Sequence, residues 1–146
     1  MKIRKYLELY KRDLVTCAPD DSVQDTAQRF SSQHICGAPV CNEDGQMLGI
    51  VSERDLVRAL GEKGRDAVKL HIRDVMTEKV TKCSPDDPMS RARQIMYDKG
   101  FRNVPVVEGQ SVVGVIGVRD ALKVRLDQKE LEVNVLKDTV IAARGG

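Results

Sequence analysis

The sequence predicts a mixed α/β (α+β) fold built from two tandem repeats, each with the order strand-helix-strand-strand-helix, followed by a C-terminal helix. Three observations predict this architecture. Segments of the first half recur in the second half in the same order, each copy alternates helical and strand-like apolar patterns, and one apolar stripe runs through the last part of the chain. A length of 146 residues suits two small repeats that share one core.

The recurring segments keep a nearly constant spacing. They pair residues 15–21 (VTCAPDD) with 80–87 (VTKCSPDD), Pro39-Val40 with Pro105-Val106, and residues 49–55 (GIVSERD) with 114–120 (GVIGVRD). The spacing is 65 residues from Val15 to Val80 and 66 from Pro39 to Pro105, a difference that loops tolerate. The register therefore indicates two copies of one unit.

A cap and a stripe predict the first helix of each copy, after a short opening strand at the recurring Val-Thr. Asp21 and Asp87 are the expected N-caps, Pro88 suits the first helical position, and Gly100 ends the second copy's helix. The residues that should face the core are Val23, Thr26, Ala27 and Phe30 in the first copy and Met89, Ala92, Ile95 and Met96 in the second.

Two apolar runs follow in each copy and predict a β-hairpin. They span residues 35–41 and 47–51, joined at Asp44-Gly45, and residues 101–107 and 112–116, joined through Gly109. A second helix in the first copy carries Leu56, Val57 and Leu60, with Gly61 after it. One such unit buries too little surface to be stable alone, so we expect the two sheets to pack together.

Glycine and charge mark the link between the copies, at residues 61–66 (GEKGRD). The expected division is residues 1–62 for the first repeat with an N-terminal helix, 63–71 for the linker, 72–125 for the second repeat and 126–146 for a helical tail.

Composition argues against several classes of function. The net charge is +2 and aromatic residues make up 3%, which argues against nucleic-acid and anionic-membrane partners. The sequence shows no recognisable targeting segment and no apolar stretch long enough to span a bilayer, so we expect a cytoplasmic protein. The four cysteines contain no C-x-x-C pair and are interpreted as reduced structural thiols rather than a metal site. We see no catalytic constellation or P-loop and expect that the protein is not an enzyme.

The ordered set of motifs resembles the CBS (cystathionine-β-synthase) domain family. Asp74-Val75-Met76-Thr77 resembles the motif that opens a repeat, and the Pro-Asp-Asp helix start, the Pro-Val strand and the Gly-x-x-Ser-x-x-Asp segment follow in the family's order. The resemblance covers roughly residues 1 to 125 and is to stand-alone bacterial proteins whose two repeats form one Bateman module. It implies two clefts between the repeats that bind AMP, ADP, ATP, NAD(H) or S-adenosylmethionine, with no required cofactor.

The resemblance assigns residues to one complete cleft. Its Asp holds the ribose hydroxyls, and the Ser three residues earlier supports the ribose or phosphate. The implied residues are Ser52, Arg54 and Asp55 from the first repeat, and Met76, Thr77, Val80, Arg102, Asn103, Val104 and Pro105 from the second. A carboxylate accepts from two vicinal hydroxyls, and Arg102 offers a permanently charged fork for phosphate.

The second implied cleft departs from the family pattern. Its residues are Val15, Ile35, Gly37, Ala38, Pro39, Gly117 and Asp120. Gly117 stands where Ser or Thr is expected, and the facing strand carries no cation. We therefore expect weaker binding there.

Simpler interpretations stay open for the same residues. Ser52-x-x-Asp55 is also a capping box, a role compatible with ligand binding. Arg102 is alternatively a solvated surface arginine. The leading hypothesis for function is a regulatory nucleotide sensor that acts on an unidentified protein partner; the alternative is a constitutive scaffold with vestigial clefts.

A heptad-like stripe marks the tail. Its members are Leu122, Leu126, Lys129, Val133, Leu136, Val140 and Ala143. One interpretation is a last helix that packs on its own domain. The one we favour is a homodimer helix, since the stripe needs a surface to bury it and the resembling family usually forms disc-like dimers. Two Lys129 side chains would meet in a parallel pair, so we expect an antiparallel crossing or packing on the partner's repeats.

Overall fold

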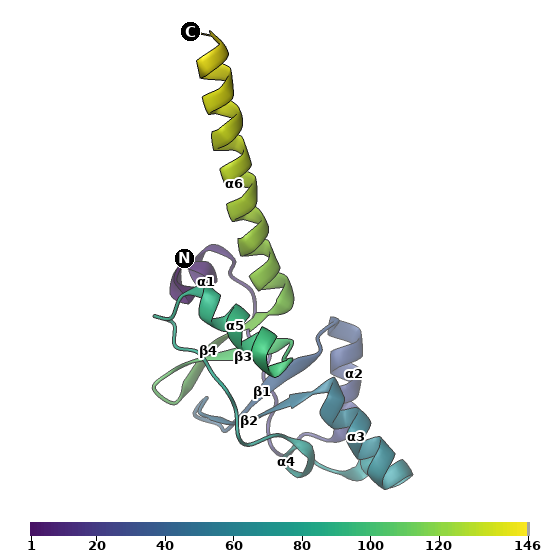
Figure 1. Cartoon of the computed structure of the whole chain (residues 1–146). Coiled ribbons are helices and arrows are strands. Elements are labelled where there is room, and N and C mark those ends of the chain that lie inside the picture. The colour runs from purple at the N-terminus through teal and green to yellow at the C-terminus, as the bar shows by residue number, and fades with distance from the viewer. Residues whose placement is uncertain (146) are drawn as a thin grey trace.

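The computed structural model describes residues 1–145, with the side chains of residues 128 and 138–145 outside the description. The predicted fold class is confirmed: there are two similar units of mixed helix and strand, and the last helix of the second unit continues as one long C-terminal helix (Figure 1). Two predicted stripe members, Val140 and Ala143, fall among the side chains that are not described.

The first unit contains α2 (Val23–Gln33), β1 (Gly37–Cys41), β2 (Met47–Ser52) and α3 (Glu53–Lys63). The second contains α5 (Met89–Lys99), β3 (Asn103–Glu108), β4 (Ser111–Gly117) and α6 (Val118–Gly145). Between the units lie the 3-10 helix η1 (Gly64–Lys69) and the short helix α4 (Ile72–Val75). The N-terminal helix α1 (Ile3–Leu9) precedes the first unit.

Each unit holds a two-stranded antiparallel sheet with the same register. Gly37 pairs with Ser52 in one sheet, and Asn103 pairs with Gly117 in the other. The predicted opening strand of each copy is reduced to one parallel bridge, Cys17 with Val40 and Cys83 with Val106. The tips of the two hairpins are in contact: Met47 N donates to Gln110 O at 3.1 Å. This contact joins the sheets into one body.

The short helices preceding the two units pack on the opposite unit. Ile72 of α4 is buried in the core of the first unit, and Ile3 and Tyr6 of α1 are buried in the core of the second. Matching backbone bonds hold both helices: Ile72 N donates to Asp21 O at 2.8 Å, and Ile3 N donates to Asp87 O at 2.9 Å. The exchange places residues from the two ends of the sequence beside one another.

The predicted caps were wrong by one residue. Ser22 is the N-cap of α2, and Pro88 occupies the N-cap of α5. The carboxylates of Asp21 and Asp87 instead accept from Ala18 N and Ser84 N, each at 2.9 Å. Aspartate closes its own loop as readily as it caps a helix, so a neighbouring residue takes the cap.

The predicted helix faces were partly wrong. Ala27, Val57 and Leu60 are exposed, whereas the remaining members of the α2 stripe and all four of the α5 stripe are buried. Helix α3 runs through Gly61 to Lys63 and buries Asp55, Leu56 and Ala59. Its inward face is therefore rotated toward the carboxylate that begins the helix, which brings Asp55 into the site.

Candidate functional site

Asp55 lies buried where β2 passes into α3. Ser52 caps the helix, and the capping box is complete: Asp55 N donates to Ser52 Oγ at 3.4 Å while Ser52 N donates to Asp55 Oδ2 at 2.8 Å. Ser52 Oγ also donates to Oδ2, at 3.1 Å. The simpler interpretation of this motif as a cap is confirmed, and it holds the carboxylate in one orientation.

The other oxygen of Asp55 faces the second repeat. Thr77 Oγ1 donates to Oδ1 at 3.3 Å, and the Arg58 guanidinium forms an ion pair with the same oxygen. The backbone of Thr77 bridges Ile50 of β2, which fixes the approach. The carboxylate is 5% exposed and the Arg58 side chain is 54% exposed. Three of the predicted residues, Ser52, Asp55 and Thr77, therefore meet at one point.

Asp120 occupies the same position between β4 and α6, with different partners. Gly117 N donates to Oδ2 at 2.7 Å, and no side-chain hydroxyl is available at Gly117. Tyr6 Oη donates to Oδ1 at 2.6 Å, and Arg12 forms an ion pair with Oδ2. Both come from the N-terminal segment that packs on this repeat. Burial, and then the hydrogen bond to Asp120, raises the pKa of Tyr6 well above its ordinary value, so the phenol stays a donor.

Asn103 links the two carboxylate sites. Its Nδ2 donates to Cys36 Sγ at 2.9 Å. A side chain at Gly37 would meet Nδ2 at 3.3 Å, and one at Gly117 would meet Oδ1 at 3.3 Å. The two glycines therefore leave room for this amide. Asn103 was predicted for one cleft and the two glycines for the other, so residues predicted for different clefts lie next to one another here.

The remaining predicted residues lie at different depths. Ala38, Pro39, Val104 and Pro105 are buried in the two sheets, and Val15, Ile35, Met76 and Val80 are half-buried. Arg54 and Arg102 are exposed. The exposed arginines can reach a charged group in solution, whereas the buried strand residues offer a cleft only their backbone.

Sequence reasoning missed Tyr6, Arg12 and Arg58. Counting back from the matched Val15 and Val80 aligns Arg12 with Thr77. These two residues contact corresponding carboxylates, so the repeat register held a signal for Arg12. Tyr6 had no such signal, because the sequence did not show that α1 packs on the second repeat.

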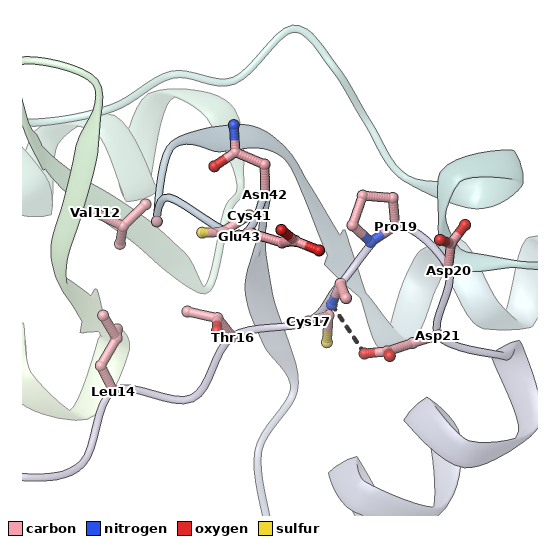
Figure 2. A pocket seen from close by; sticks show the side chains of 12 residues that line it. Leu14, Thr16, Cys17, Pro19, Asp20, Asp21, Cys41, Asn42, Glu43 and Val112 are labelled. Atoms are coloured by element: carbon pink, nitrogen blue, oxygen red, sulfur yellow. Dashed lines mark hydrogen bonds between the residues drawn. The ribbon is translucent and has the colours of Figure 1, made fainter.

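A pocket lies elsewhere, at the loop after Cys17 and the turn of the first hairpin (Figure 2). Three of its lining residues are acidic, Asp20, Asp21 and Glu43, and it contains none of the predicted cleft residues. Arg73 and Arg29 already form ion pairs with Asp20 and Asp21. Acidic lining disfavours a phosphate, so this pocket is a poor nucleotide site.

The thiols fit a structural role. Burial raises the pKa of Cys17, Cys41 and Cys83, which keeps these thiols protonated. Among the described residues there is no group of three His, Cys, Asp or Glu side chains placed to hold a metal. In the same part of the chain, no helix combines the length and apolarity that a membrane crossing requires.

A family model for the CBS domain matches this chain twice, over residues 7–62 and 72–127. The chain belongs to the CBS domain family. A CBS-domain protein from Agrobacterium tumefaciens, ATU1752, is 32% identical and superposes with a TM-score of 0.78 over 86% of this chain and 99% of that one. CBSX2, solved in complex with AMP, is 20% identical and has a TM-score of 0.72 over 82% and 92% of the two chains.

Sequence relatives of this CBS pair include longer proteins. The mitochondrial CBS domain-containing protein CBSX3 of Arabidopsis thaliana is 30% identical over 125 residues, which cover 82% of this chain and 60% of the relative. The chain thus spans about 60% of the length of the first curated relatives it matches.

Proposed function

We propose that this CBS pair is a regulatory module that binds an adenine nucleotide at Asp55 and performs no catalytic step itself. The observation that carries the proposal is a buried carboxylate placed between the repeats: Asp55 is 5% exposed, and Thr77 of the other repeat donates to it. A ribose bound there contacts both repeats, so occupancy favours one arrangement of the repeats over others.

The two oxygens of Asp55 serve different purposes in this proposal. Oδ2 stays bonded to Ser52 and maintains the cap. Oδ1 exchanges its bonds to Thr77 and Arg58 for bonds from the two ribose hydroxyls, because one carboxylate oxygen can accept two hydrogen bonds. Arg58 is half-exposed and moves into solvent at little cost.

Three features are proposed to bind the phosphate. At the N-terminus of the eleven-residue helix α3, Glu53 N already donates to Cys36 O and Asp55 N to Ser52 Oγ, which leaves the N–H of Arg54 and the positive end of the helix dipole for a phosphate. Arg54 lies in its first turn, and Arg102 lies just before β3; both are exposed. AMP, ADP, ATP, NAD(H) and S-adenosylmethionine all carry the ribose this site would hold, and the AMP complex of CBSX2 supports an adenine nucleotide.

A second candidate function is a constitutive scaffold whose clefts are vestigial. It is favoured by the observation that Asp55 and Asp120 both have arginine partners within the chain. In either case the protein partner that the module acts on is to be identified by capture with and without nucleotide.

Nucleotide-dependent thermal stabilisation separates the two functions. A ligand at 100 times its dissociation constant adds about 2.7 kcal/mol to the stability of the folded state. We expect AMP, ADP, ATP or NADH to raise the melting temperature more than the matched guanine nucleotides do. If no adenosine compound at millimolar concentration raises the melting temperature, the sensor function is contradicted and the scaffold function remains.

A further inference from the structure

Helix α6 carries two apolar faces, and only one of them meets the body of the protein. Ala121 and Val124 pack into the core of the second repeat. Leu131 lies seven residues after Val124 and Val135 fourteen after Ala121, so both continue this face past the end of the body. The opposite face presents Leu122, Leu126, Val133 and Leu136 to solvent.

We call this opposite face the outer stripe. Helix α6, which carries it, extends away from the body (Figure 1). Helix α6 has 28 residues and is therefore about 42 Å long. Leu126 and Leu136 are each 65% exposed. Apolar surface is unfavourable in water, so burial of the outer stripe would stabilise the protein. Their heptad spacing matches the seam of a coiled coil rather than that of a broad groove-binding face.

Charged residues flank the outer stripe on both sides in an alternating pattern. On one side lie Lys123, Glu130 and Lys137, and on the other lie Arg125 and Glu132. All five are exposed. In a coiled coil these flanking positions meet those of the neighbouring helix, so their signs determine which partner and which orientation are favoured.

We propose that the outer stripe binds the same stripe of a second copy of this chain in a parallel coiled coil. In that pairing Arg125 lies beside Glu130 of the second copy and Glu132 lies beside Lys137 of the second copy. The two-fold symmetry forms each contact twice, so four opposite-charge pairs flank the seam.

The fully overlapped antiparallel pair is disfavoured by the same residues. Full antiparallel overlap brings Glu130 near Glu130 and Glu132 near Glu132 of the second copy, and it also brings Lys123 near Lys137. Every close flanking contact between charged groups is then repulsive. An antiparallel pair shifted by one heptad brings Lys123 near Glu130 and Arg125 near Glu132, but it removes the repulsions only by shortening the overlap. The parallel pair therefore combines full overlap of the stripes with opposite flanking charges.

Lys129 is accommodated at the edge of the seam. Its Nζ lies 3.6 Å from Glu132 Oε2 of its own helix, so the ammonium is turned to the flank while its apolar stem covers the stripe. One charged layer weakens a coiled coil but fixes its register. The parallel pair places both nucleotide-binding modules at the same end of the coil.

Charge reversal in the full chain tests the orientation. Glu132→Lys and Lys137→Glu alone each create two like-charge contacts in the parallel pair, so we expect each to weaken the dimer roughly fivefold or more by sedimentation equilibrium. The double variant restores opposite charges and should dimerise as the wild type does. A monomeric wild-type chain, or a double variant no better than the singles, overturns the proposal.

Disulfide trapping gives an independent readout with a matched control. Leu136 and Leu131 are each 65% exposed on the same helix, but on opposite faces. Under mild oxidation Leu136→Cys should form a covalent dimer rapidly, whereas Leu131→Cys and the wild-type chain should not. Equal trapping at both positions, or trapping at Leu131→Cys alone, contradicts a seam along the outer stripe.

Discussion

The two repeats of this CBS pair use one duplicated carboxylate in different ways. Asp55 is bonded by neighbours in its own cap and by Thr77, and its arginine partner lies three residues away on the same helix. Asp120 is bonded by Tyr6 and Arg12, which are 114 and 108 residues distant in sequence. The first carboxylate has partners that we propose a ligand replaces, whereas the second anchors the N-terminal segment.

This difference explains why a duplicated motif need not give two equal sites. Replacing Ser by Gly117 removes a hydroxyl from the second cap, and the N-terminal segment supplies a phenol and a guanidinium in its place. In the proposed function, stability and ligand binding are thereby divided between the two repeats. Variants of Asp120 should therefore reduce stability more, and variants of Asp55 should reduce nucleotide binding more.

The largest expected effect is on stability. Asp120→Ala leaves the buried Tyr6 hydroxyl without its acceptor and releases Arg12, so we expect a loss of about 3 kcal/mol in the free energy of unfolding. Asp55→Ala removes a cap whose other members are partly exposed and should cost only about 1 kcal/mol. Urea denaturation without nucleotide measures both. Equal losses would show that Asp120 is not a special anchor.

A smaller effect is expected from Tyr6→Phe, about 1.5 kcal/mol, because the hydrogen bond to a charged acceptor is lost. The pKa of Tyr6 is raised in the folded state, so its neutral form is favoured by folding. That contribution is complete below the phenol's ordinary pKa of 10.0 and declines as pH rises above it toward the folded value.

Alkaline denaturation tests this sign. The wild type should lose stability above pH 10 more steeply than Tyr6→Phe, whereas Tyr97→Phe, at a position 86% exposed, should follow the wild type. If the stability of Tyr6→Phe and of the wild type fell with pH in parallel, Tyr6 would not stabilise the fold through Asp120.

Arg12→Ala should have a small stability effect, about 1 kcal/mol, since this side chain is 56% exposed. This variant also tests what closes the cleft at Asp120. With Arg12 gone, Asp120 loses one competitor for ribose hydroxyls, and calorimetry should detect additional, weak AMP binding. Unchanged binding would mean that Tyr6 and Gly117, rather than Arg12, close this cleft.

Much of the fold could be predicted from the sequence because the helices and hairpin of each repeat are formed by residues close together in the chain. Hydrophobic spacing located the buried face of α5, and the matched segments located both hairpins. The faces of α3 were less predictable, since burial of Asp55 rotates the helix and exposes Val57 and Leu60. A polar residue that faces inward reverses the pattern on which such predictions depend.

The site was predictable only where it depends on the motif. Ser52, Asp55 and Thr77 meet in the structure, and the family resemblance had assigned all three to one cleft. Of the partners of Asp120, the repeat register pointed only to Arg12; Tyr6 was not predictable, because the exchange of α1 onto the second repeat brings distant residues together. Local spacing carries no information on such a contact.

AMP titration by calorimetry tests the central claim most directly. We expect Asp55→Asn to weaken AMP binding by roughly 1–3 kcal/mol through lost charge-assisted hydrogen bonds, and Asp120→Asn to weaken it less. Circular dichroism at the titration temperature confirms that both variants are folded. Equal losses for the two variants, or full AMP affinity in Asp55→Asn, would contradict the assignment of the nucleotide to the Asp55 cleft.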